Sequence, residues 1–215
     1  MGSRSDRPPL ILASGSPRRR ELLGSLGLSF DIVVPDVDET PEDGENADRM
    51  VERLARSKAA RVSASHPGSL VLAADTTVAL DREILGKPAD DDEARRMLRR
   101  LSGRTHEVFT GVALLHAAES FERRFLSRSI VEVVALDDAR IDAYVATGEP
   151  LGKAGAYAIQ SRAAEFLELR EGFRSNVIGL PVEDVIERLR EHPSGAFSDL
   201  PRTPSDPVAD DEEFA

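Results

Sequence analysis

The chain passes from strand to helix within residues 10–19, whose sequence is LILASGSPRR. The apolar run from Leu10 to Ala13 is typical of a short buried strand. Ser16 offers a hydroxyl cap for a helix, and Pro17 suits its first turn. A strand that leads into a helix N-terminus presents free backbone N–H groups and the positive end of the helix dipole. This segment therefore predicts an α/β unit with an anion-binding turn.

Polar side chains of the same turn could add donors to an anion site. Ser14 and Ser16 carry hydroxyls, and Arg18 and Arg19 carry guanidinium groups that make charge-assisted hydrogen bonds. The alternative is an ordinary capped helix with a basic surface turn, which an isolated Ser-Pro-Arg-Arg run would favour. Carboxylates at strand ends elsewhere in the chain favour the anion site.

Apolar periodicity predicts alternating strands and helices in the rest of the chain. The expected strands are 30–34, 70–74, a hairpin over 77–85, 105–115 and 124–134, and the expected helices are 47–63, 90–101, 137–147 and 181–191. This order predicts the α/β class, with a mixed sheet flanked by helices around a cleft.

The length of 215 residues suits one domain, and composition changes near its ends. We expect a folded domain over residues 10–192 and disordered termini at 1–9 and 193–215. From His192 onward the chain has six acidic residues, one basic residue and four prolines. Such a segment has too little apolar content to fold alone.

Composition also limits the chemistry. The chain has no cysteine, and its four histidines show no paired metal spacing. Any metal is therefore expected on carboxylates, which favours Mg²⁺ or Mn²⁺ over zinc. The net charge of −11 argues against a nucleic-acid partner. No apolar run is long enough for a membrane span, so we expect a soluble, cytoplasmic protein.

Lysine is rare, with only three residues against twenty-five arginines. A lysine ammonium suits a point contact with phosphate, whereas arginine presents a planar fork. Lys87 and Lys153 each follow a glycine, and Lys58 lies in the expected helix 47–63. The alternative for each lysine is surface solubility, which is a weaker explanation in so lysine-poor a chain. The three lysines point to a polyphosphate ligand.

Asp75 directly follows the continuous apolar run 70–74. Ligand sites in open α/β sheets lie at the carboxyl ends of strands, where a carboxylate can hold a cation or accept a proton from water. The alternative for Asp75 is a turn or capping residue. Asp38 and Glu39 form a second acidic pair, either on a loop over the cleft or as solvated charges.

Several short motifs occur in a characteristic order along the chain. They are LASGSPRR at 12–19, ADT at 74–76, LGKP at 85–88, LSG at 101–103, KAGAY at 153–157 with Gln160, and SNVIGLP at 175–181. From near Leu10 to near Leu189 the chain resembles the Maf family of nucleoside-triphosphate pyrophosphatases. The resemblance implies a Maf-like and ITPase-like fold with two lobes around a central cleft.

The resemblance also implies an activity and roles for individual residues. The reaction would cleave a nucleoside triphosphate between the α and β phosphates, with a divalent cation, in an enzyme that is a homodimer. Asp75 would accept a proton from water, and Asp75 and Glu39 would hold the metal. Substrate binding and selection would involve the residues Arg18, Thr76, Gln160, Ser14, Ser16, Arg19, Lys58, Lys87 and Lys153.

The combination of Thr76 and Gln160 is similar to the branch that acts on dTTP and UTP. One stretch departs from the family pattern, because Gly152, Ala158 and Ser161 stand where Asp, Gly and Gly are frequent. Two alternatives stay open. The chain could be a nucleotide-binding regulator of cell division without turnover, or a pyrophosphatase directed at purines or 7-methyl-GTP.

Overall fold

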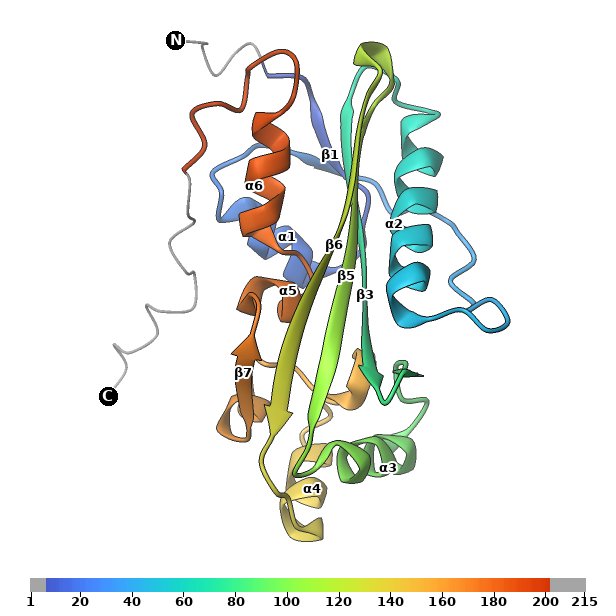
Figure 1. Cartoon of the computed structure of the whole chain (residues 1–215), viewed down its shortest axis with the longest axis vertical. Helices are drawn as coiled ribbons and strands as arrows, with labels where there is room; N and C mark the ends of the chain where they lie inside the picture. The colour runs from blue at the N-terminus through green and yellow to red at the C-terminus, as the bar shows by residue number, and fades with distance from the viewer. Residues whose placement is uncertain (1–6, 202–215) are drawn as a thin grey trace.

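The computed structural model describes residues 7–201, and one mixed sheet forms its centre (Figure 1). The strand order is β2-β1-β3-β5-β6-β7, and β4 pairs with β3 off this path. β1 runs parallel to β2 and β3, and the other pairs are antiparallel. The bounds are β1 Leu10–Leu12, β2 Asp31–Ile32, β3 Leu70–Leu80, β4 Glu83–Leu85, β5 Thr105–His116, β6 Phe121–Val133 and β7 Leu167–Glu171. The predicted mixed α/β architecture is confirmed.

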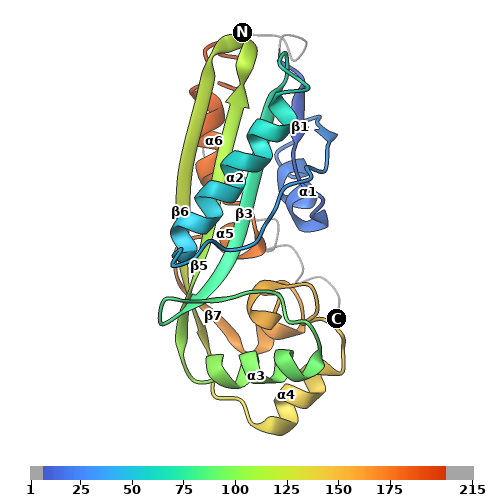
Figure 2. The same cartoon turned by 90° about the vertical axis from the view of Figure 1, so that its right-hand side faces the viewer.

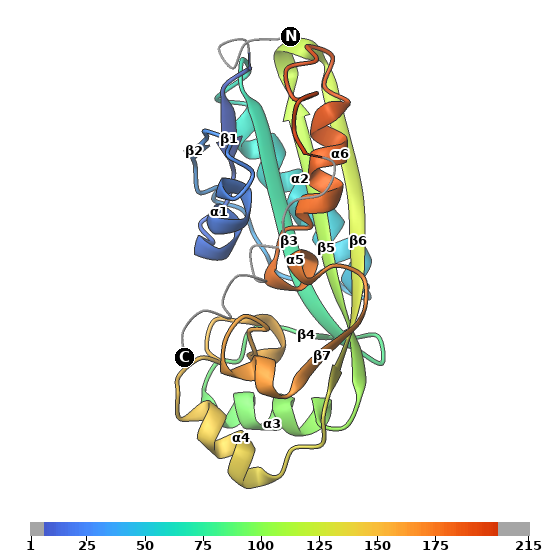
Figure 3. The ribbon, with the colours of Figure 1, turned by 90° about the vertical axis from the view of Figure 1, so that its left-hand side faces the viewer.

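Helices cover both faces of the part of the sheet that is uppermost in Figure 1, and two further helices pack at its lower end in the same view. Figure 2 shows α2 lying along one face, and Figure 3 shows α1 and α6 on the opposite face, with α3 and α4 below. The bounds are α1 Pro17–Gly24, α2 Ala47–Ser63, α3 Asp91–Leu101, α4 Asp138–Val145, α5 Arg174–Ile178 and α6 Val182–Arg190. No helix within residues 7–201 has the length and apolar character that a membrane crossing requires.

Strand alternation builds the two layers of the upper core. Successive side chains of a strand point to opposite faces, and both faces of β1 and β3 are buried. Leu10 and Leu12 pack in a cluster with residues of α1 and α6, whereas Ile11 packs with Ala55 and Ala59 of α2. Each face of the upper sheet therefore has its own apolar layer.

A separate apolar cluster forms the lower lobe. It joins the ends of β3, β5 and β6 to α3 and α4, and its fully buried members include Leu80, Leu98 and Ile141. The hairpin between β3 and β4 turns at Asp81 and Arg82, which both have positive φ, as a two-residue type I′ turn requires. The predicted hairpin and the predicted two lobes are both present.

β3 continues well beyond the end predicted from the apolar run. It extends to Leu80, so Asp75 lies in the middle of the strand and not at its end. β5 pairs with β3 along the whole of residues 71–79, which holds the polar middle in extended conformation. On the other side β1 pairs with residues 70–72 and β4 with 78–80. Residues 73–77 have no strand partner on that side within the described chain.

The chain after His192 corrects the predicted domain boundary. Phe197 and Leu200 are buried in the core cluster of α1 and α6. Arg7 donates from Nε to Ala196 O at 2.8 Å and from Nη2 to Asp199 Oδ1 at 2.6 Å. Residues 7–9 and 193–201 therefore belong to the folded body, because tertiary contacts bury two apolar side chains there. The rest of the predicted disordered termini, 1–6 and 202–215, lies outside the described residues.

Candidate active site

The gap beside residues 73–77 of β3 opens into a cavity of about 800 Å³ between the two lobes. Its walls come from the turn after β1, the middle of β3, β4 with the residues that follow it, α2, the loop that follows α4 and the end of α5. The predicted site residues all line it: Ser14, Ser16, Arg18, Arg19, Glu39, Lys58, Asp75, Thr76, Lys87, Lys153 and Gln160. The sequence thus predicted which residues converge, although it misplaced Asp75 within its strand.

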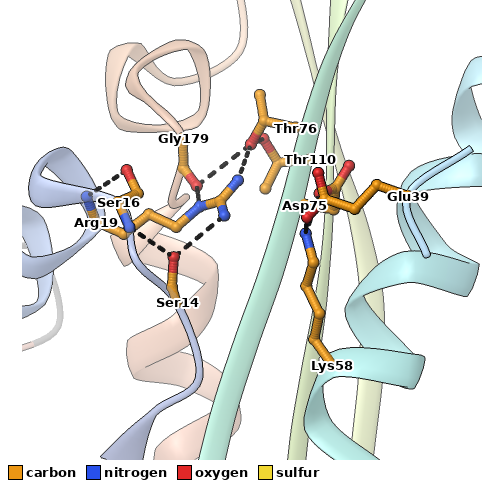
Figure 4. A network of polar contacts seen from close by, with 9 residues as sticks. All are labelled: Ser14, Ser16, Arg19, Glu39, Lys58, Asp75, Thr76, Thr110 and Gly179. Carbon is orange, nitrogen blue, oxygen red and sulfur yellow. Dashed lines mark hydrogen bonds and ion pairs between the residues drawn. The ribbon is translucent and has the colours of Figure 1, made fainter. Parts of the chain in front are cut away.

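Lys58 joins the two predicted metal ligands. Its Nζ lies 2.6 Å from Asp75 Oδ1 and 2.6 Å from Glu39 Oε1 (Figure 4). Lys58 and Asp75 are buried, whereas Glu39 is half exposed. Burial alone would raise the pKa of Glu39. The hydrogen bond and charge of Lys58, together with the charge of Lys87, outweigh burial and lower that pKa. Glu39 is therefore held as a carboxylate.

A glycine lets α2 come close enough for this contact. Gly111 of β5 is the register partner of Asp75. A Cβ at Gly111 would lie 2.4 Å from Val51 O of α2, far inside contact distance. Any larger residue would push the helix away from the sheet at the level of Asp75. Gly111 thus sets the helix–sheet distance at the site, a role that sequence reasoning missed.

Arg19 organises the opposite face of β3. Its guanidinium donates to Gly179 O at 2.8 Å, to Thr76 Oγ1 at 3.0 Å and to Ser14 Oγ at 3.4 Å. Thr76 and Asp75 are neighbours in a strand, so their side chains point to opposite faces, as Figure 4 shows. One strand therefore supplies an acidic group to one wall of the cavity and a hydroxyl to the other.

Two buried residues behind Thr76 were not predicted as part of the site. Thr110 Oγ1 lies 2.9 Å from Thr76 Oγ1 and donates to Asn176 O at 3.1 Å. Asn176 donates from Nδ2 to Val108 O at 3.1 Å and to Ser129 Oγ at 2.9 Å. Both Thr110 and Asn176 are fully buried. Asn176 belongs to the SNVIGLP motif, which was the available sequence signal, and the network fixes the wall formed by Thr76.

Cations outnumber carboxylates around the cavity. Burial lowers the pKa of Lys153, and the nearby charge of Arg18 lowers it further while Glu149 opposes both. Burial likewise lowers the pKa of Arg18. Arginine stays protonated despite such shifts, so Arg18 adds positive charge to this wall. Lys87 is exposed and forms no ion pair within the described chain. These groups can bind a polyanion.

Gln160 lines the cavity from the segment that follows α4, whereas Lys58 lines it from α2. Its side chain is exposed, and it makes no hydrogen bond with any residue from 7 to 201. Tyr157 lines the same region and is buried, with its hydroxyl 2.6 Å from His106 Nε2. A free amide beside an aromatic residue can read the edge of a nucleobase.

Comparison with known proteins agrees with the motifs. The family model described as Maf-like protein matches residues 9–192. A dTTP/UTP pyrophosphatase of Myxococcus xanthus is 51% identical over 185 residues, which cover 86% of this chain and 93% of the relative. A protein with the same name from Pelotomaculum thermopropionicum is 49% identical, with 85% of this chain and 95% of the relative covered. Another from Halalkalibacterium halodurans is 45% identical, with 86% of this chain and 96% of the relative covered. The chain belongs to the Maf family.

Proposed function

We propose that this protein hydrolyses dTTP and UTP between the α and β phosphates, releasing the nucleoside monophosphate and pyrophosphate. The observation that carries the proposal is the Asp75–Lys58–Glu39 cluster, which faces a cavity whose other charged lining residues are all cations. A triphosphate has about four negative charges near neutral pH and needs such surroundings. The similarity to proteins named dTTP/UTP pyrophosphatase supports the same reaction.

Asp75 is the proposed general base. A water oxygen forms the new bond to the α phosphorus as the bond from that phosphorus to the bridging oxygen breaks. Asp75 accepts the water proton, and pyrophosphate leaves with the electron pair of the broken bond. Lys58 holds the Asp75 carboxylate in place, since its Nζ is 2.6 Å away. Arg18, Arg19 and Lys87 line the cavity, and we propose that they stabilise the departing charge.

We propose Glu39 and Asp75 as the protein ligands of Mg²⁺ or Mn²⁺. No group of three or more acidic or histidine ligands forms a cage within residues 7–201. Two carboxylates still fit Mg²⁺, which keeps several waters and usually binds through one or two carboxylates plus substrate phosphates. When bound, the cation would neutralise phosphate charge and polarise the phosphoryl oxygens.

Gln160 is the proposed reader of the base. Its amide has one acceptor and two donors, which can match the carbonyl and N3–H of uracil or thymine. Cytosine presents opposite groups at positions 3 and 4. An unpaired buried polar group costs roughly 1–3 kcal/mol, so replacing Gln160 with Ala should reduce the preference for UTP over CTP by about 5- to 150-fold. An unchanged ratio of kcat/KM values would assign base reading to Arg18, Thr76 or backbone groups.

Product identification tests the reaction. Purified protein with Mg²⁺ or Mn²⁺ should release pyrophosphate, and not orthophosphate, from dTTP and UTP. The matched variants are Asp75→Asn, which should abolish release, and Asp184→Asn, a half-buried carboxylate outside the cavity that should not. Binding without turnover would favour a regulatory role, and faster turnover of GTP or 7-methyl-GTP would favour the purine-directed alternative.

Location and assembly are also proposals. A chain without cysteine suits the reducing cytoplasm. The homodimer rests on the family resemblance, and light scattering coupled to size exclusion would test it. A monomer at assay concentration with full activity would remove the dimer from the proposal.

A further inference from the structure

Gln160 has a free side chain on a strongly fixed backbone. Arg174 Nη2 donates to Ile159 O at 2.8 Å, just before Gln160. Ala158 N donates to the hydroxyl of Tyr144 at 3.3 Å. Residues on the N-terminal side of Gln160 are therefore tied to α5 and α4. Since the amide of Gln160 makes no hydrogen bond with residues 7–201, its orientation depends on how the backbone is held.

On the C-terminal side the hydroxyl of Ser161 is the side-chain group that holds the segment. Ser161 Oγ donates to Glu149 Oε2 at 2.5 Å and also lies 3.0 Å from Ala158 O. Ser161 N donates to Ala158 O at 3.2 Å, which closes a turn around Gln160. Ser161 has an extended backbone with negative φ, so any residue can adopt its conformation. The hydroxyl contact, and not the backbone, distinguishes serine at this position.

Glu149 also reaches the other end of the loop. Its backbone carbonyl accepts a hydrogen bond from Nζ of Lys153, a lysine that lines the cavity. Burial raises the pKa of Tyr144 to about 12, and the charge of Glu149 contributes. The Tyr144 hydroxyl therefore stays protonated near neutral pH. Glu149 therefore contacts both Lys153 and Ser161, which lie at the two ends of the segment that carries Gln160.

We infer that the Glu149–Ser161 hydrogen bond orients Gln160, and that both residues are positioning residues for base selection. This inference rests on the proposed function. A carboxylate acceptor makes the contact stronger than a hydrogen bond between neutral groups. Without the contact no side chain outside the turn holds Ser161, although its backbone bonds to Ala158 and Ala164 remain, and the amide of Gln160 samples orientations that suit cytosine as well as uracil.

Four variants test the inference through the ratio of kcat/KM for UTP to kcat/KM for CTP. Ser161→Ala and Glu149→Ala should each lower this ratio by about 3- to 10-fold, the effect of one ordinary hydrogen bond. The double variant should lose no more than either single variant, because both remove the same contact. Glu149→Gln should keep the ratio, since an amide oxygen still accepts from Ser161. The kcat for UTP should change little in all four.

Ser25→Ala is the matched control, because Ser25 Oγ donates to Leu22 O at 2.7 Å at the end of α1, away from the cavity. It should leave the ratio unchanged. If Glu149→Ala does not fold, Ser161→Ala decides alone. Equal losses with both nucleotides, additive losses in the double variant or an unchanged ratio would each overturn the inference. Wild-type protein that releases no pyrophosphate from any nucleotide would instead refute the proposed function.

Discussion

The ammonium of Lys58 lies 2.6 Å from a carboxylate oxygen of Asp75, and the two residues are only 6% and 8% exposed. A buried charge without a partner costs far more than an exposed one. Glu39 gives Lys58 a second partner, also at 2.6 Å, whereas Asp75 has Lys58 alone among the ion pairs of residues 7–201. Removing one member of this pair should therefore have different consequences from removing the other.

Asp75→Asn should leave the protein folded and nearly inactive. Lys58 keeps Glu39 as its partner, so the melting temperature should change little. Loss of a general base typically lowers kcat by about 10²- to 10⁴-fold. Thermal melting checks the expected stability, and a pyrophosphate-release assay checks the expected loss of kcat. Near-normal turnover in a folded variant would remove Asp75 from the mechanism.

Lys58→Met should instead lower stability as well as activity. Asp75 would be left buried without its cation, at a cost of about 3 kcal/mol. Urea unfolding measures this loss. Lys87→Met is the matched control, because Lys87 is exposed and forms no ion pair with the described residues. Equal stability of the two lysine variants would show that solvent compensates Asp75 for the lost contact.

Arg19→Lys should show that the guanidinium fork is required. Arg19 reaches Gly179 O, Thr76 Oγ1 and Ser14 Oγ at once, and a lysine ammonium can replace at most part of this geometry. Hydrogen bonds from charged groups contribute roughly 1.5–3 kcal/mol each, so we expect kcat/KM to fall by about 10- to 100-fold. Arg20→Lys, at an exposed position of the same helix, is the control. A similar loss in both variants would contradict a specific role.

Long elements with regular periodicity could be predicted from the sequence. The expected helix 47–63 matches α2, and the helix 90–101 differs from α3 by one residue. β7 and α5 were not predicted, because each is only five residues long and carries little periodic signal. The middle of β3 was not predicted either. Asp75, Thr76 and Thr77 interrupt its apolar run because the site needs polar groups there.

The site residues on distinctive motifs were predicted, but the residues that support them were not. Thr110 lies in an ordinary strand sequence, and its role depends on Thr76 being its register partner across β3 and β5. Burial of Phe197 likewise depends on a surface formed by residues far away in sequence, including Phe121. Such contacts follow from tertiary packing, which a local pattern does not encode.

The segment 193–201 should contribute to stability. Phe197 is fully buried, and its ring packs edge-on against that of His192, with 5.8 Å between the ring centroids. Replacing a buried Phe with Ala costs roughly 3–5 kcal/mol, which corresponds to a fall in Tm of about 6–20 °C in a protein of this size. Truncation after Pro193 should lower Tm at least as much. Truncation after Pro201 is the control, and an unchanged Tm in Phe197→Ala would mean that the segment does not stabilise the body.

His106 should make the protein less stable in mild acid. Burial lowers its pKa to about 4, and its Nδ1 has no hydrogen-bond partner within the described chain. In the unfolded chain histidine titrates near 6.5, so the unfolded state binds more protons between these two values. The stability that depends on neutral His106 is therefore complete above about pH 6.5 and declines as the pH falls toward 4. The expected loss is about 1.4 kcal/mol per pH unit at most, or roughly 3 kcal/mol in total.

Urea unfolding of wild type and His106→Gln between pH 4.5 and 7.5 measures this contribution. Glutamine can still pair with the Tyr157 hydroxyl, which otherwise would be a buried group without a partner. It does not titrate, so the variant should lose less stability than wild type as the pH falls. His66→Gln, at a partly exposed position after α2, should retain the wild-type slope. Parallel pH profiles for wild type and His106→Gln would show that His106 is not the group whose protonation destabilises the fold.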